Sequence, residues 1–333
     1  MTFKTVPEVL AAFDLASRAA GHSRNTRRGY LATVEEFATM LHAREIDGPQ
    51  SYFDHLAGVK CLSSKSVWHA LNPLKFLYER VLEKEFGQYR LPKRNTGRRI
   101  PSELSHADII NLLCLLDRIP RLQAGLLYGC GLRVESDMLK LRLKDIHLDD
   151  GVLVIQSGKG DKSRALRLPQ SLIPELRRQV DACRRQWQID RSSGTICPID
   201  DDSLMRKFGR RTFGTLPWFW LFPSRNLHQT DRGPERWHAT DKRLVTGLKE
   251  AAATLGITQR VHPHAFRHSY ATNLLRSGTD IRTIQQQLGH TNVQTTEIYA
   301  HAMGAKGVDS PLDADLSAPL PDSATIIPFR RTA

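Results

Sequence analysis

A basic segment divides this 333-residue chain into two parts. Residues 90–99 carry five Arg and Lys side chains, one Pro and one Gly, and they show no apolar periodicity. Such a segment favours an extended linker, because nothing in it would be buried against a core. The length also suits about two domains. We therefore predict domains over residues 1–89 and 101–315, joined by a basic linker over residues 90–100 and followed by a tail over residues 316–333.

The first part shows helical periodicity up to about residue 88. One helical face after Thr26 and another over residues 64–84 collect apolar side chains. The two sets are Tyr30, Val34, Phe37, Ala38 and Leu41, then Trp68, Leu71, Leu74, Tyr78 and Leu82. Pro73 is expected to kink or break the second helix. These patterns predict a small helical bundle, with a basic surface where Arg24, Arg27 and Arg28 cluster.

The second part combines helices with a β-hairpin. Ser105 and Asp108 have the spacing of a capping box before an apolar run, which predicts a helix start. Two β-type runs, residues 152–156 and 165–168, flank a Gly- and Lys-rich loop. Helices are predicted from about Phe266 to Gly278, over residues 279–289 and around Tyr299. The predicted fold class is mainly α with a small antiparallel β-sheet.

Charge and composition narrow the classes of partner. The chain has 48 Lys and Arg against 35 Asp and Glu, a formal net charge of +13. This excess favours a polyanionic partner. On charge alone, a soluble basic protein without such a partner is an equal alternative. No apolar stretch approaches the roughly 20 residues that cross a bilayer, and no signal-peptide core follows Met1. We expect a cytoplasmic protein with no membrane partner.

No metal site is predicted. The five cysteines are scattered without a CxxC pair, which argues against a disulfide framework or a zinc site and fits a reducing compartment. His264 and His268 have the spacing of a zinc pair, but the Glu of the HExxH pattern is missing.

Six side chains in separate stretches suit one chemistry, the cleavage of a phosphodiester. They are Arg133 in Gly-Leu-Arg, Lys159 between two glycines of the hairpin loop, His264 and Arg267 at a helix start, His290 after Leu-Gly, and Tyr299. Cleavage needs a nucleophile, donors for the phosphate oxygens and an acid for the leaving oxygen. Arginine meets two phosphate oxygens at once, and lysine can protonate a leaving 5′ oxygen. A tyrosine nucleophile stores the bond energy as an ester, so no metal or nucleotide cofactor is needed.

Each residue alone has an ordinary alternative. Arg133 would be a surface arginine, Lys159 a charged hairpin tip, His290 a partner of a helix dipole, and Tyr299 an amphipathic core residue. His268 is expected to face away from Arg267, within the core. The order and spacing of the six are what favour the functional interpretation.

In this order and spacing the chain resembles the tyrosine recombinase (phage integrase) family, whose signature runs Arg, Lys, His-x-x-Arg, His, Tyr. The likeness covers nearly the whole chain. It implies a helical core-binding (SAM-like) DNA-binding domain over residues 1–89 and an α+β catalytic domain over residues 101–315. It also implies a C-shaped clamp on duplex DNA and a homotetramer that exchanges strands through a Holliday junction. Subunits would be linked by a C-terminal segment after about Ser310. The implied catalytic residues are Arg133, Lys159, His264, Arg267, His290 and Tyr299.

A closer likeness is to integron integrases. It rests on residues 204–208, 218–225 and 307–312, and it implies an insertion over about residues 200–237. In those enzymes the insertion helps to grip bases that protrude from a folded single-stranded cassette site. Trp218, Phe219 and Trp220 either stack on such bases or belong to the core.

One departure from the family pattern follows the first arginine. The family usually places an acidic residue three positions after it, where this chain has Ser136 between Glu135 and Asp137. The spacing from the first arginine to Leu139 and Leu141 is also one residue longer than is usual in the family. Either the helix accommodates an insertion or a different carboxylate supplies the support.

Three alternatives stay open beside the integron integrase. The chain would then be a phage or mobile-element integrase, a Xer-like resolvase, or a catalytically impaired relative that only binds DNA. A type IB topoisomerase uses related chemistry, but the short length and the helical first part argue against it.

Overall fold

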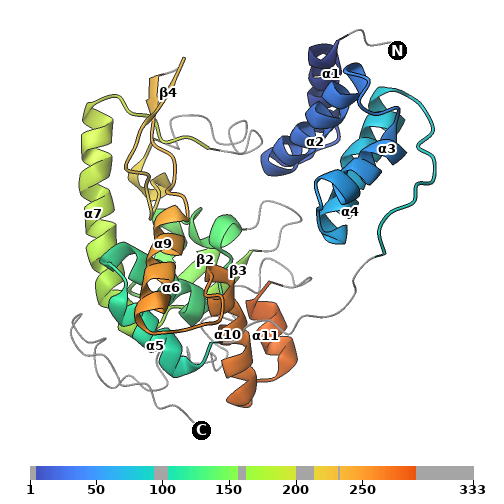
Figure 1. Cartoon of the computed structure of the whole chain (residues 1–333). Helices are drawn as coiled ribbons and strands as arrows, with labels where there is room; N and C mark the ends of the chain where they lie inside the picture. The colour runs from blue at the N-terminus through green and yellow to red at the C-terminus, as the bar shows by residue number, and fades with distance from the viewer. Residues whose placement is uncertain (1–4, 94–103, 157–162, 200–213, 232, 290–333) are drawn as a thin grey trace. The chain divides into compact units, whose positions relative to one another are not determined.

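The computed structural model describes residues 5–93, 104–156, 163–199, 214–231 and 233–289, and the chain divides into two compact units, Met1–Arg99 and Ile100–Ala333 (Figure 1). The described part of the first unit is helical. Its elements are α1 (Val6–Ala19), α2 (Arg24–His42), α3 (Pro49–Asp54), the π-helical turn η1 (His55–Val59), α4 (Ser64–Phe76) and the π-helical turn η2 (Leu77–Val81). The roles assigned to the two domains and their limits remain predictions.

The predicted faces of the first unit are only partly correct. In α2, Val34 and Phe37 are buried as expected, but Leu41 is 39% exposed near the end of the helix. In α4 and η2 the buried face turns slightly from the predicted one, so that Trp68 and Tyr78 are half-buried. The residues buried there are Val67, Ala70, Pro73, Leu74, Leu77 and Val81.

Pro73 does not end its helix. It lies buried inside α4, and the chain continues directly into the π-helical turn η2. Proline has no N–H to donate to the preceding turn, and the wider spacing of η2, where Leu82 N–H donates to the Leu77 carbonyl, follows one turn later. Instead of a break, the hydrogen-bond spacing changes from the α-helical to the π-helical pattern after α4.

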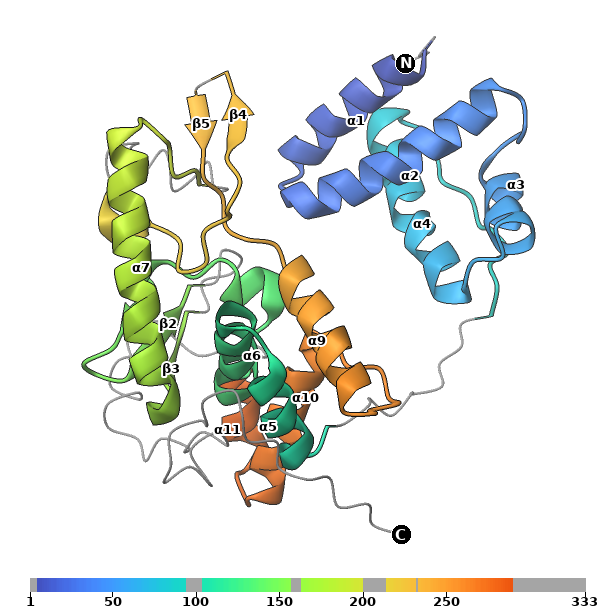
Figure 2. The ribbon, with the colours of Figure 1, turned by 60° about the vertical axis from the view of Figure 1, so that its left-hand side comes forward.

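The second unit is mainly helical with two small antiparallel sheets, as the fold class predicts. Figure 2 shows the three-stranded sheet with α7 on one side and α6, α10 and α11 on the other. Its helices are α5 (His106–Leu115), α6 (Arg118–Cys130), α7 (Ile173–Ser192), α9 (Lys242–Thr254), α10 (Pro263–Arg276) and α11 (Ile281–Gln287). Its strands are β1 (Ile146–His147), β2 (Val152–Ile155), β3 (Arg164–Arg167), β4 (His228–Thr230) and β5 (Gly233–Glu235). Its short turns are η3 (Val134–Met138), η4 (Leu143–Asp145), η5 (Gln170–Leu172) and η6 (Leu216–Trp218).

Two local predictions in the second unit are confirmed. Ser105 caps α5, with its side chain accepting from Asp108 N–H and the Asp108 carboxylate accepting from Ser105 N–H. Strands β2 and β3 form the predicted hairpin, with Leu153 opposite Leu166. Both patterns are local, so short-range spacing was enough to define them.

Helix α6 forms the centre of the second unit. Ten of its thirteen residues are buried, which is typical of a helix enclosed by its neighbours rather than one that faces solvent. Helix α10 packs along it, and α6 ends at Gly131 in the left-handed conformation. The end of α6 therefore lies beside α10. Among the described helices, none is long and apolar enough to cross a membrane.

Candidate functional site

One buried guanidinium group brings three of the sequence motifs together. Arg267, on the second turn of α10, is 8% exposed. Its Nη1 donates to the Gly131 carbonyl, and its Nη2 donates to the Leu288 carbonyl at 2.7 Å. These carbonyls stand where α6 and α11 end, and helix ends leave carbonyls without partners inside the helix. Arg267 thus gives each of two helix ends a donor, and it joins Gly131 of Gly-Leu-Arg to Leu288, two residues before His290 in the sequence.

Gly131 is required by its surroundings. Its φ is +61°, which a side chain disfavours. A Cβ atom there would lie 2.6 Å from the ring of Tyr270, whose hydroxyl donates to Gln287 Oε1 at 2.5 Å. The glycine lets α6 end against α10 and fixes the course of the chain that carries Arg133 two residues later.

A π-helical turn accommodates the extra residue after Arg133. In η3 the Met138 N–H donates to the Arg133 carbonyl, and Leu139 N–H donates to Val134, both five residues back. A π-turn holds one residue more than an α-turn. The first of the two alternatives is therefore correct, and the turn directs the buried Asp137 inward while Glu135 and Ser136 stay exposed.

Asp137 is the carboxylate that supports the arginines. Its Oδ2 accepts from Arg133 N–H at 3.0 Å and from Arg164 Nη2 at 2.5 Å. The same oxygen lies 3.8 Å from Arg133 Nη1 and 4.0 Å from Arg267 Nη1. The structure therefore places both predicted arginines around one oxygen and adds Arg164, which the sequence reasoning did not assign.

The cluster has an excess of positive charge, because three guanidinium groups surround one carboxylate. Burial alone would raise the pKa of Asp137, but the charge of Arg164 and the hydrogen bonds from Arg133, Arg164 and Ser136 outweigh burial, and the pKa is lowered. Burial, with Arg133 and Arg164 nearby, lowers the pKa of Arg267 to about 10. Asp137 and Arg267 are therefore both charged at neutral pH, and a site with three guanidinium groups around one carboxylate is suited to an anion such as a phosphate.

The histidines of α10 are more exposed than Arg267. His264 and His268 are both exposed, so the expectation that His268 lies within the core is wrong. His262 caps the helix, with its Nδ1 accepting from Ala265 N–H at 3.1 Å. Burial and neighbouring positive groups lower the pKa of His262 and of His268. The neutral forms of His262 and His268 are therefore favoured.

Three of the six predicted catalytic residues, Lys159, His290 and Tyr299, lie outside the described residues, as do residues 204–208 and 307–312. In the sequence, Lys159 stands between β2 and β3, and His290 directly follows Gly289. In the described part of the chain, no group of three or more His, Cys, Asp or Glu side chains is placed to hold a metal ion.

The aromatic cluster of the predicted insertion is mostly core. Phe219 and Trp220 are 1% and 2% exposed, so neither is available for base stacking. The Arg142 guanidinium lies 3.1 Å from the centre of the Trp220 ring, and Arg142 Nη1 donates to the Trp218 carbonyl at 2.6 Å. Trp218 is half-buried, with Lys144 Nζ over its ring at 4.6 Å. The core alternative therefore holds for Phe219 and Trp220.

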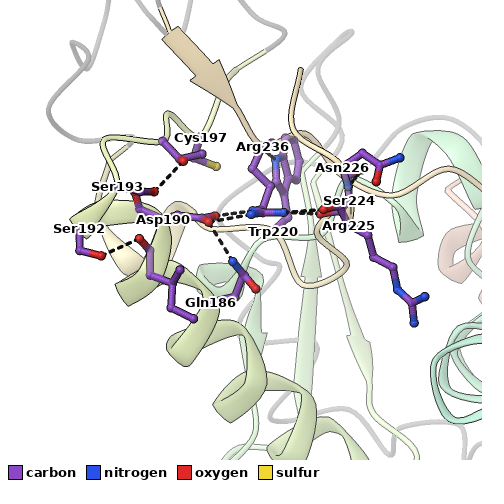
Figure 3. A network of polar contacts seen from close by, with 12 residues as sticks. Gln186, Asp190, Ser192, Ser193, Cys197, Trp220, Ser224, Arg225, Asn226 and Arg236 are labelled. Carbon is purple, nitrogen blue, oxygen red and sulfur yellow. Dashed lines mark hydrogen bonds and ion pairs between the residues drawn. The ribbon is translucent and has the colours of Figure 1, made fainter. Parts of the chain in front are cut away.

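A buried ion pair fastens the same region to α7 (Figure 3). Arg236 donates through Nε and Nη2 to Asp190, at 2.5 and 2.8 Å, and through Nη1 to the Ser224 carbonyl. Trp220 Nε1 donates to the Arg236 carbonyl at 3.1 Å. Sequence reasoning missed this pair, because its partners are separated by 46 positions. The network holds the base of the β4–β5 hairpin, whose strand β4 is exposed along its length.

Comparison with known proteins agrees with the motifs. Residues 106–305 match the phage integrase family, and residues 9–88 match the phage integrase N-terminal SAM-like domain. An "Integrase/recombinase" of Escherichia coli is 40% identical over 88% of this chain and 89% of its own. The tyrosine recombinase XerD of Pseudomonas aeruginosa is 30% identical over 86% of this chain and 89% of its own.

Two solved structures share the fold. The XerH site-specific recombinase bound to its difH substrate has a TM-score of 0.54 at 18% identity, covering 89% of this chain and 82% of its own. The Tn1549 transposon integrase in complex with circular intermediate DNA has a TM-score of 0.56 at 16% identity, covering 89% and 98%.

We expect Gly131→Ala to be more destabilising than an ordinary glycine replacement. The new methyl group would meet the Tyr270 ring, and the alanine would have to keep a left-handed backbone conformation. Together these effects should lower the unfolding free energy by about 2 to 4 kcal/mol. Gly256→Ala is the matched control, because its φ is +65° and nothing lies within 4 Å of the added atom. Urea unfolding followed by tryptophan fluorescence measures both, and equal losses would contradict the proposed contact.

Asp137→Asn should destabilise the chain at neutral pH by about 3 to 5 kcal/mol, because three arginines lose their buried counter-ion. Since the pKa of Asp137 is lower in the folded chain than in the unfolded one, this contribution is present above about pH 4 and is lost as the pH falls through the folded value. The gap between Asp137→Asn and wild type in unfolding free energy should therefore narrow below about pH 4.

Glu135→Gln is the control for that experiment. Glu135 is exposed on the same turn, so its replacement should change the unfolding free energy by less than about 0.5 kcal/mol. If Glu135→Gln lowers the unfolding free energy more than Asp137→Asn does, Asp137 is not the carboxylate that supports the arginines.

Proposed function

This chain belongs to the phage integrase family of tyrosine recombinases, which cut and rejoin DNA at specific sites, and we propose that Arg133, Lys159, His264, Arg267, His290 and Tyr299 are its catalytic residues. The observation that carries the proposal is the convergence of Arg133 and Arg267 on one Asp137 oxygen. A second support is the hydrogen bond from Arg267 to the Leu288 carbonyl, which holds the chain two residues before His290 beside Arg267.

In the proposed reaction the Tyr299 oxygen attacks the scissile phosphorus. The bond from phosphorus to the 5′ oxygen breaks, leaving a 3′-phosphotyrosyl ester and a free 5′ hydroxyl. Lys159 donates the proton that the leaving 5′ oxygen takes up, and His264 assists removal of the tyrosine proton. Arg133, Arg267, His264 and His290 stabilise the charge on the non-bridging oxygens. Rejoining is the reverse, with a DNA 5′ hydroxyl as nucleophile.

The two parts of the chain are proposed to divide the work. Residues 1–89 would bind DNA, the basic linker over residues 90–100 would follow a phosphate backbone, and residues 101–315 would carry out cleavage. Four copies would act together on two sites. The net charge of +13 supports this arrangement, since most of the affinity of such proteins for DNA comes from phosphate contacts.

The more specific proposal is an integron integrase that inserts and excises gene cassettes. Its support is the segment of about residues 200–237, whose described part forms the β4–β5 hairpin fixed to α7 by Asp190 and Arg236. Because Phe219 and Trp220 are core residues, contact with protruding bases would fall to the exposed surface of this segment, including Trp218 and β4. A phage or mobile-element integrase or a Xer-like resolvase is the alternative.

The catalytic proposal is tested with labelled duplex fragments that cover the DNA flanking the gene. Wild-type protein should form a covalent adduct that survives denaturant, and Tyr299→Phe should form none, because the nucleophilic oxygen is gone. Tyr30→Phe, a half-buried tyrosine of the first unit, should keep the adduct. An adduct in Tyr299→Phe would refute the nucleophile. Binding without an adduct in wild type would identify a catalytically impaired relative.

The integron proposal is tested by supplying the same flanking site either as a folded single strand or as plain duplex. Recombination with a second duplex site, counted by amplification across the new junction, should be more frequent with the folded strand. This is expected because bases that protrude from it give the inserted segment something to grip. Recombination of duplex sites alone would favour the mobile-element integrase or the resolvase.

A further inference from the structure

Arg164 is a partly buried arginine outside the six proposed catalytic residues. It begins strand β3, and its side chain is 11% exposed. Its Nη2 donates to Asp137 Oδ2 at 2.5 Å, which is the shortest of the contacts on that oxygen. The Arg133 and Arg267 guanidinium groups stand at 3.8 and 4.0 Å from the same atom. Arg164 is therefore the main partner of this carboxylate.

The end of α11 leaves room for Arg164. Gly289 has a φ of +69°, and a Cβ atom there would lie 2.7 Å from Arg164 Nη1 and 3.1 Å from its Cζ. Only a glycine lets the chain turn this closely over the guanidinium group. The glycine of Leu-Gly-His thus has a steric role toward a residue of the hairpin strand.

The pairing has a consequence for the other two arginines. A carboxylate without Arg164 would draw the Arg133 and Arg267 groups into direct ion pairs, since they are the nearest remaining cations. With Arg164 bonded to it, Asp137 remains beyond hydrogen-bond distance of both terminal nitrogens. The carboxylate then orients these groups by charge without taking the donors that a phosphate needs.

We propose that Arg164 is a positioning residue of the strand-cleaving site. It fixes the Asp137 carboxylate so that Arg133 and Arg267 present their guanidinium groups to the scissile phosphate. This inference rests on the proposed function. A purely structural arginine would normally have its buried donors satisfied, whereas the Arg164 Nε is buried with no acceptor among the described residues.

The test compares Arg164→Met with Arg167→Met, an exposed arginine on the same strand. The probe is whichever flanking duplex fragment forms the adduct with wild type. Arg164→Met should bind it within about threefold of wild type, because most phosphate contacts remain. Its single-turnover rate of adduct formation should fall by about 10- to 100-fold, because the two guanidinium groups are misplaced. Arg167→Met should match wild type in rate.

Two further readouts separate positioning from a loss of stability. The charge of Arg164 is the largest influence that lowers the pKa of Asp137 against burial. In Arg164→Met that pKa should rise, so the acid side of the profile of adduct rate against pH should shift to higher pH than in wild type. Adding Asp137→Asn to Arg164→Met should cause no further loss of rate, because Arg164 acts through that carboxylate. Losses that multiply would overturn the inference.

Arg164→Lys covers the case in which Arg164→Met does not fold. It keeps the charge but not the planar fork, so it should fold and cleave at an intermediate rate. Failure of both variants to fold would make Arg164 structural and overturn the inference. If wild type forms an adduct and Arg164→Met forms it equally fast, the inference alone fails. If wild type forms no adduct with any flanking fragment, the proposed function fails and the inference falls with it.

Discussion

The bonds from Arg267 to the Gly131 and Leu288 carbonyls hold the candidate site together. They join the ends of two helices that lie far apart in the sequence and give one carbonyl at each end a hydrogen-bond donor. Burial lowers the pKa of Arg267 to about 10, which still leaves the side chain protonated at neutral pH. The bonds therefore persist under the conditions in which DNA would be bound, and the same group remains positively charged toward a phosphate.

Local patterns predicted the fold most reliably. The capping box at Ser105 and the hairpin of β2 and β3 are defined by residues close in sequence, and both are present. The faces of longer helices were less certain, as Leu41 shows, because a helix end can lose its neighbour while the periodicity continues. Pro73 shows the same limit, since its effect depends on which hydrogen bonds the surrounding helix can rearrange.

The chemistry of the site predicted which arginines would meet, but not what would hold them. Arg133 and Arg267 were expected to bind one phosphate, and in the structure both lie near one carboxylate oxygen. The identity of that carboxylate could not be read from the spacing, because a π-turn and an α-turn of the same residues direct different side chains inward. The pairing of Asp137 with Arg164 spans 27 positions and links a turn to a strand, so no short-range pattern contains it.

In the second unit, the β4–β5 hairpin and the arginine cluster around Asp137 are held by separate ion pairs. This separation has a consequence for function. Figures 1 and 2 place the β4–β5 hairpin at one end of the unit and α10 and α11 at the other. The hairpin base depends on Asp190 and Arg236, whereas the arginine cluster depends on Asp137. Under the proposed function β4 would contact DNA, and mutations on its exposed face would change that surface without moving the arginine cluster. Such an arrangement allows the substrate to diverge among relatives while the cleavage chemistry stays constant.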